Sequence, residues 1–212
     1  MLLSIALLLA AVEPKATASV KFKLTGVEDE RPLIKEVSVN NEALDVAFHV
    51  TFDRAPSGAA CENRCANATL FVDTDFDKAT GLKLSDPKAL ENGADVALVF
   101  QGRKSSGEGG EAPEFLIRVK KLANEAGGLD DSEVLHEFNV FRDKQRVHVR
   151  EANVVVMVDT SEKKFPLGRR MRLVYHPPGA AAVEGVVAGP VKAGGARKVQ
   201  VIDESKKKKG AR

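Results

Sequence analysis

Aromatic residues suited to binding sugar rings are almost missing from this 212-residue chain. It contains no tryptophan and a single tyrosine, Tyr175. Carbohydrate-binding platforms depend on flat aromatic faces, mostly those of Trp and Tyr. The ten phenylalanines lie mostly in strand-like patterns, where packing in a core is the expected role. The composition therefore excludes a tryptophan platform, and any sugar binding would have to use polar groups.

Cysteine is nearly absent as well. The chain has two cysteines, Cys61 and Cys65, separated by three residues. Two cysteines with no histidine nearby make at most half of a zinc site, and they allow no more than one disulfide. In an oxidising compartment the simplest expectation is a local disulfide between Cys61 and Cys65 that orders the loop around them. A pair of unlinked thiols is the alternative.

Signatures of known catalytic sites are also lacking. The chain has no Gly-x-Ser-x-Gly elbow, no P-loop and no dinucleotide-binding glycine pattern. His136 and Glu137 begin like a zinc-protease motif, but Val140 occupies the position of the second histidine. We therefore expect a non-catalytic protein. A hydrolase whose acid and base are an unrecognised carboxylate pair remains an alternative, because such pairs have no sequence signature.

No apolar run is long enough to span a bilayer. The longest is the eleven-residue stretch from Leu2 to Val12, and the small residues Ala16-Thr17-Ala18 follow it. This order is typical of a secretory signal peptide, although no Lys or Arg precedes the run. We expect residues 1–18 to be a signal peptide for bacterial export, a secreted or periplasmic mature protein, and no transmembrane span in the mature chain.

The rest of the chain is rich in short runs of Val, Ile, Leu and Phe. In Val46 to Phe52, large apolar residues alternate with smaller or polar ones, as in a strand with one buried face. No long amphipathic helix separates the runs, which favours antiparallel pairing. The pattern predicts an all-β antiparallel β-sandwich over residues 19–179. The expected strands are 33–39, 44–52, 69–73, 96–101, 115–120, 146–150, 154–159 and 171–176, and residues 134–141 are ambiguous between strand and helix.

Two further segments have their own patterns. Asp86, Pro87 and Gly93 have the order of a helix cap, a first helical residue and a helix end, and they predict one short helical turn. Residues 180–212 are rich in Gly and Ala and end in Lys206 to Lys209, with eight Lys and Arg against three Asp and Glu. We expect a linker and a disordered basic tail. A polysaccharide or a cell-envelope component is a candidate partner; without aromatics among the lysines, sequence-specific nucleic-acid binding is not expected.

Aspartates recur at alternate positions where a predicted strand ends. Asp73, Asp75 and Asp77 have the i, i+2, i+4 spacing that turns carboxylates toward one hard cation on a curled loop. An EF-hand is rejected, because Lys78 occupies the glycine position and Leu84 the position of the bidentate glutamate. The spacing predicts a calcium site, with a solvated acidic turn as the alternative.

A longer motif surrounds these aspartates: Asp73-Thr74-Asp75, then Thr80-Gly81, then Gly93-Ala94-Asp95 at the start of the next strand. It resembles the DTD…TG…GAD signature of secreted bacterial β-sandwich domains, which are similar to DOMON-like domains and family 9 carbohydrate-binding modules. The resemblance implies a jelly-roll-like sandwich in which the loop aspartates and Asp95 hold a structural calcium ion. In those modules an aromatic residue often follows the Gly-Ala-Asp sequence, whereas this chain has Val96 at that position.

Together these observations predict an exported, calcium-stabilised β-sandwich that acts as a non-catalytic binding or surface-interaction module. The alternatives are a structural envelope or secretion accessory protein and the hydrolase described above. Haem or copper binding is a minor option. Some of the DOMON-like domains that the motif resembles bind these groups, and the ligands here would be Met157 and Met171 with His148 or His176.

Overall fold

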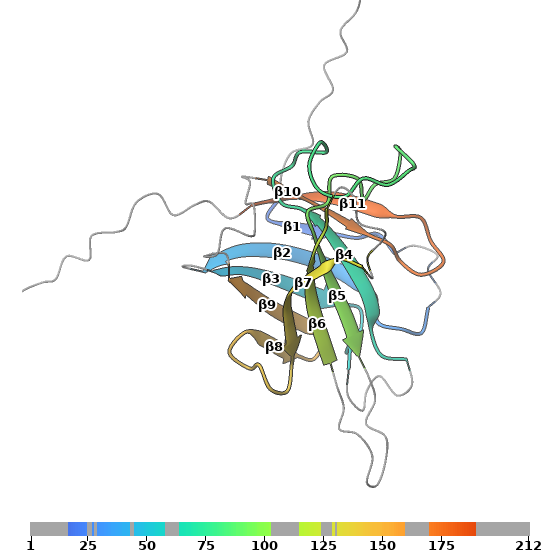
Figure 1. Ribbon diagram of the computed structural model, residues 1–212. Coiled ribbons are helices and arrows are strands. Elements are labelled where there is room, and N and C mark those ends of the chain that lie inside the picture. Colours follow the sequence, from blue (N-terminus) through green and yellow to red (C-terminus); the bar gives the residue numbers. More distant parts are fainter. Residues whose placement is uncertain are drawn as a thin grey trace, which may run out of the picture.

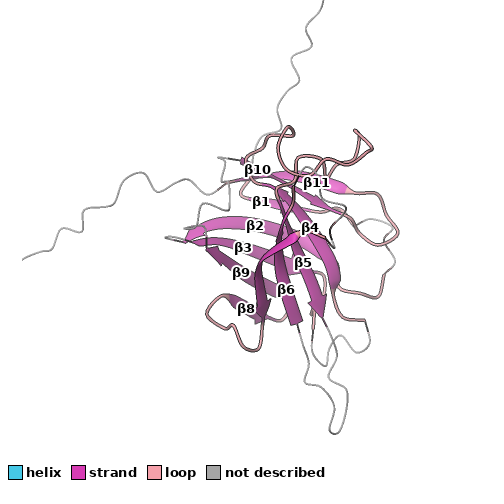
Figure 2. Ribbon diagram, viewed as in Figure 1, coloured by secondary structure: helices cyan, strands magenta, loops and turns pink. Residues whose placement is uncertain are grey.

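The computed structural model describes residues 17–24, 27, 29–42, 45–57, 64–102, 115–123, 129, 131–159 and 170–189. Within these residues the chain forms strands and no helix (Figures 1 and 2). The strands are β1 (Ser19–Lys21), β2 (Ile34–Glu42), β3 (Asp45–Phe52), β4 (Asn67–Asp73), β5 (Val96–Gly102), β6 (Phe115–Lys121), β7 (Glu133–Asn139), β8 (Val147–Arg150), β9 (Asn153–Asp159), β10 (Arg170–Tyr175) and β11 (Val183–Ala188).

The strands form two antiparallel sheets packed face to face. One sheet has the order β1-β2-β3-β9-β8, and the other has the order β11-β10-β4-β5-β6-β7. Figure 1 shows the two layers, with β2, β3 and β9 in one and β4, β5 and β6 in the other. The predicted antiparallel β-sandwich is therefore confirmed. The chain crosses between the sheets after β3, β7 and β9, which places residues distant in sequence on neighbouring strands.

All eight predicted strands are present, and the ambiguous segment 134–141 is mostly the edge strand β7. Two strands lie outside the predicted set, namely β1 and β11. β1 has only three residues, and β11 lies inside the segment expected to be a linker, where it pairs with β10. Thr17, inside the expected signal peptide, bridges to Val187 of β11, with backbone hydrogen bonds of 3.1 and 2.9 Å.

The predicted helical turn at residues 86–93 is wrong. Instead of a helix, the described chain forms turns here, in which Lys88 N–H donates to the Asp86 carboxylate at 2.9 Å and Ala89 N–H to the Asp86 carbonyl at 3.1 Å. The carbonyls of Leu90 and Asn92 accept hydrogen bonds from the side chain of Arg172 on β10. Asn92 N–H donates to the Ala89 carbonyl at 3.3 Å and Ala94 N–H to the Glu91 carbonyl at 2.9 Å, so the segment is a series of i to i+3 turns without the i to i+4 bonds of an α-helix.

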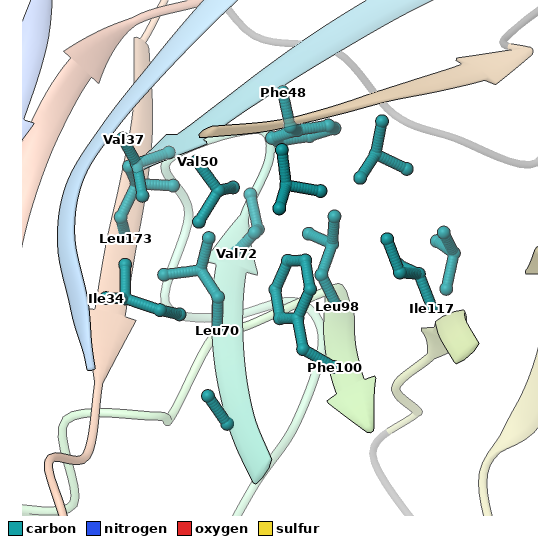
Figure 3. Packing of buried hydrophobic residues seen from close by; sticks show 14 of the residues in the cluster. Ile34, Val37, Phe48, Val50, Leu70, Val72, Leu98, Phe100, Ile117 and Leu173 are labelled. Carbon is teal, nitrogen blue, oxygen red and sulfur yellow. The ribbon is translucent and has the colours of Figure 1, made fainter. Parts of the chain in front are cut away.

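The main core fills the space between the sheets. The predicted buried face of β3 is confirmed: Val46, Phe48, Val50 and Phe52 are all almost fully buried. Figure 3 shows Phe48 and Val50 across from side chains of β4 and β5. Each such side chain contributes roughly 1.5–3 kcal/mol through removal of apolar surface from water. This core holds the two sheets together.

A second, smaller apolar cluster covers the outer face of the six-stranded sheet. Ala97 and Val99 of β5 are buried there beneath Leu82 and Ala94 of the β4–β5 connection and Leu122. Leu82 N–H donates to the Ala94 carbonyl at 2.7 Å, and Gly93 N–H to the Leu82 carbonyl at 2.8 Å. The acidic connection is therefore folded against the sheet at this point, which fixes the position of its aspartates.

Several predictions fall on residues outside those described. Residues 1–16 and 190–212, which hold most of the expected signal peptide and the basic tail, are among them. Cys65 is buried and not a free thiol, but Cys61 lies outside the described residues, so the disulfide between them stays a prediction. In the part of the chain that is described, no helix has the length and apolar character needed to cross a membrane.

Candidate metal centre

Two neighbouring strands place a pair of aspartates side by side. β4 ends at Asp73, and β5 begins directly after Asp95. The strands are antiparallel neighbours, and Asp95 N–H donates to the Val72 carbonyl at 2.9 Å. Figure 1 shows the connection between them, in green, extending beyond the strand ends. The sheet pairing therefore brings together two carboxylates that are 22 residues apart in sequence.

Asp73, Asp75 and Asp95 form a carboxylate cluster. One oxygen from each lies within 4.8 Å of the others. Oxygen ligands around one calcium ion, at 2.3–2.6 Å from the metal, are separated by about 5 Å or less. The spacing of the cluster therefore matches a single hard cation. Three of the four predicted ligands meet here, including Asp95, which only the resemblance had indicated.

Asp77, the fourth predicted ligand, has a different position. Its carboxylate is exposed, and one of its oxygens accepts a hydrogen bond from Ala79 N–H at 2.9 Å. Its own N–H donates to Asp75 at 2.9 Å and to Asp73 at 3.2 Å. Asp77 lies outside the three-carboxylate group, and its backbone orients two members of that group. As a ligand it stays a prediction.

Two threonines hold the cluster in place. Thr74 donates from both its N–H and its hydroxyl to one oxygen of Asp95, at 2.8 and 2.9 Å. The Thr80 hydroxyl lies 3.2 Å from both oxygens of Asp75, 3.4 Å from the other oxygen of Asp95 and 2.9 Å from the Asp77 carbonyl. One oxygen of Asp95 is thus fixed by Thr74, while the other lies at the longer distance of 3.4 Å from the Thr80 hydroxyl.

Arg172 of β10 is the cation of the site, and the sequence motif did not reveal it. Its Nε and Nη2 lie 3.2 Å from one oxygen of Asp73, and Nη1 donates to the Leu90 carbonyl at 2.8 Å. Arg172 is 4% exposed, and Asp73 is 2% exposed. Arg172 also lies 3.6 Å from Glu184 of β11. Arg172 joins the acidic connection to the six-stranded sheet.

The electrostatics of the cluster favour a cation. Burial is the main cause that raises the pKa of Asp73 to about 6; Arg172 opposes this rise, and the charge of Asp95 adds to it. Burial also raises the pKa of Asp95, with Asp75 acting in the same direction and the hydrogen bonds from Thr74 acting against it. Arg172 contacts Asp73 and also lies near Glu184, so its single positive charge does not balance the three carboxylates of the cluster. A bound cation would offset the excess of negative charge.

Two glycines of the motif are required by the backbone. Gly81 and Gly93 have φ values of 63° and 88°, in the region that side chains disfavour. A Cβ at residue 81 would lie 2.3 Å from the Ala94 carbonyl oxygen, and one at residue 93 would lie 2.6 Å from the Cα of Lys78. Both contacts are too close for any side chain. The glycines therefore allow the connection to double back over the aspartates.

Three of the residues considered for haem or copper, Met171, His176 and His148, lie at separate places in the fold. Met171 is fully buried in the inter-sheet core, and His176 lies 2.6 Å from the carboxylate of Glu91. His148 is exposed on β8, in the other sheet. Among the residues that the structure describes, the aspartate cluster is the group of three or more His, Cys, Asp or Glu side chains that comes together.

Comparison with models of protein families, with curated protein sequences and with solved structures finds no match to this chain. The resemblance to DOMON-like and family 9 carbohydrate-binding modules therefore stays a prediction. The residues themselves carry the argument for the site.

Proposed function

We propose that the chain is an exported, calcium-stabilised β-sandwich that acts as a non-catalytic binding or surface-interaction module, with a polysaccharide or another cell-envelope component as its partner. The observation that carries the calcium part is the convergence of Asp73, Asp75 and Asp95 at the end of β4 and the start of β5. Export is supported by the apolar run and small residues within 1–18. Export predicts loss of these residues, which intact-mass measurement of the secreted protein would detect.

Calcium suits the donor set better than the other common metals. The cluster offers oxygen atoms only, which hard cations prefer, whereas zinc and copper sites in proteins use His or Cys. Calcium accepts several carboxylates in flexible geometry, while magnesium keeps most of its waters and binds one or two. Asp75 lies on the connection, and Asp95 lies directly before β5. An ion bound by both carboxylates would link the connection to the six-stranded sheet. Its main effect would be to stabilise the folded chain.

The burial of the cluster argues for a structural role rather than an acid–base role. A catalytic carboxylate must reach its substrate, whereas Asp73 is 2% and Asp95 is 8% exposed. Arg172 and Thr74 also hold these two carboxylates in place. This cluster is therefore proposed as a metal site and not as the acid–base pair of a hydrolase.

The calcium part is tested by thermal unfolding with excess calcium, excess magnesium and chelator. A ligand that binds only the folded state, at about 100 times its dissociation constant, stabilises it by about 2.7 kcal/mol. We expect a higher midpoint with calcium in the parent and in Asp131→Asn, an exposed control. In Asp75→Asn, which removes a partly exposed ligand, we expect most of this rise to disappear.

Comparing the unfolding midpoints in calcium, magnesium and chelator also shows whether a cation binds and whether that cation is calcium. If the parent has the same unfolding midpoint in calcium and in chelator, the proposed calcium site is contradicted. A rise with magnesium equal to the rise with calcium would retain a cation site and contradict its assignment to calcium.

A further inference from the structure

A cavity of about 350 Å³ lies at the opposite end of the sandwich from the aspartate cluster. Ser57 at its wall follows Pro56, whose carbonyl accepts a hydrogen bond from Ala66 N–H just before β4 begins. The seven residues of β4 separate this end from Asp73, a distance of roughly 20 Å. The cavity is lined by Ser57, Val140, Phe141, Lys144, Val147, His148 and Val149. Its volume is within the range of small-molecule sites.

The cavity has an apolar floor. Val147 of β8 and Val140 at the end of β7 are buried, and Val149 is partly buried. Phe141 is 45% exposed, which makes it one of the few large apolar side chains exposed among the described residues. A ring at the opening of an apolar cavity offers a contact surface to a ligand with an apolar body.

The turn that carries Phe141 and Lys144 is held in shape by its own hydrogen bonds. Phe141 N–H donates to the Asn139 side chain at 3.0 Å, and Asn139 N–H donates to the Asp143 carboxylate at 2.7 Å. Val147 N–H donates to the Asp143 carbonyl at 3.0 Å. The cavity wall is thus formed before any ligand arrives, which lowers the entropic cost of binding.

The polar groups of the cavity are cationic or hydrogen-bond donors. Lys144 and His148 line it, and no carboxylate does. Residues 142–150 contain one acidic side chain, Asp143, and four cationic side chains: Arg142, Lys144, Arg146 and Arg150. Asp143 accepts the bond from Asn139, and Arg146 binds Asp45 at 2.7 Å. The Lys144 ammonium has no ion-pair partner in the described part of the chain.

We propose that this cavity binds a small amphipathic anion, namely a monocarboxylate with an aliphatic or aromatic body. The body lies on the valines and Phe141, and the carboxylate accepts hydrogen bonds from Lys144 and His148. A peptide that pairs as an extra strand with the edge strand β8 is a less favourable ligand. β8 has four residues, fewer than the five or six of an average strand, and therefore offers few backbone hydrogen bonds. This binding does not depend on the calcium site.

The test uses 8-anilinonaphthalene-1-sulfonate, a fluorescent anion with an apolar body, as the probe for the intact protein. We expect saturable binding at one site and displacement by decanoate. Decanol has the same chain without the charge, and we expect it to displace the probe at about tenfold higher concentration. That factor corresponds to the loss of one charge-assisted hydrogen bond.

Two surface variants locate the site. Lys144→Gln should raise the dissociation constant of decanoate about tenfold and leave that of decanol unchanged, when both are calculated with the probe affinity of the same variant. Phe141→Ser should raise both dissociation constants. Lys88→Gln, an exposed lysine at the other end of the sandwich, is the matched control and should behave as the parent. Lys144→Gln and Lys88→Gln should unfold at the same temperature as the parent, because both lysines are exposed. Phe141→Ser should unfold at a somewhat lower temperature, because its ring is 45% exposed and the remainder is packed.

Other results would overturn the proposal. It fails if decanoate and decanol displace the probe equally, if Lys144→Gln binds decanoate as the parent does, or if the probe does not bind. Repeating the titration with Asp75→Asn in chelator distinguishes the two sites: decanoate binding should persist there, whether or not calcium stabilises the parent protein.

Discussion

The six-stranded sheet has two buried regions that are stabilised in opposite ways. Its inner face contributes Leu70, Leu98 and Phe100 to the core, where contacts are apolar and non-directional. Its outer face, where β4 ends, buries Asp73 and Arg172 among hydrogen bonds of defined geometry. The first region is expected to be indifferent to ions and pH, whereas the second is expected to respond to both. The degree of burial therefore does not show whether a region is stabilised by apolar contacts or by hydrogen bonds and ion pairs.

The largest expected effect tests the apolar side of this comparison. Phe100→Ala removes a fully buried ring that contacts Phe52 and Phe115. We expect a loss of about 3–5 kcal/mol in the free energy of unfolding, equal in calcium and in chelator. Urea titration under both conditions measures it. A loss that differs by more than about 1 kcal/mol between them would mean that the core and the metal site are coupled.

A glycine substitution tests the polar side. Gly81→Ala forces a Cβ against the Ala94 carbonyl at a positive φ, and we expect a loss of about 3 kcal/mol from strain and overpacking. Gly179→Ala is the matched control, because φ is 70° there but nothing lies near the added Cβ. We expect the control to lose about 1 kcal/mol and to keep the response to calcium. Equal losses in the two variants would contradict the close packing of the connection.

The smallest effect is the pH dependence of the polar region. The pKa of Asp73 is about 6 in the folded chain and near 3.8 when unfolded, so the folded state holds the extra proton between these values. In chelator, stability should therefore rise as the pH falls from 7 to 4, by about 2 kcal/mol relative to Asp73→Asn.

Calcium provides the control for this measurement. A bound cation favours the ionised carboxylate, so saturating calcium should remove the rise. Parallel stability curves for the parent and Asp73→Asn in chelator would contradict the assignment of this pKa to Asp73.

Much of the fold could be predicted from the sequence because strand signals are local. The alternation in residues 46–52 identifies the buried face of β3, and similar runs identify the other long strands. β11 was missed because its buried pattern is short and irregular, and it depends on pairing with β10. The helical turn at residues 86–93 was wrong because the capping residues serve turns that pack on the sheet.

The candidate site shows the same division. Asp73 and Asp75 were found from spacing, and Asp95 was found from the resemblance. Arg172 was missed because it lies 99 residues after Asp73 and meets it only through the pairing of β10 with β4. The signal that could have indicated it is an arginine placed between Met171 and Leu173 inside a largely apolar strand.

By itself the sequence determined that the chain forms antiparallel strands and that acidic residues follow β4, because period-two alternation and residue spacing are properties of neighbouring positions. Only the tertiary structure decided which carboxylates meet, which cation joins them and where a cavity with cationic residues forms. These features depend on the register between strands and on how turns fold over sheet ends. Register is set by the packing of the whole core rather than by any one segment.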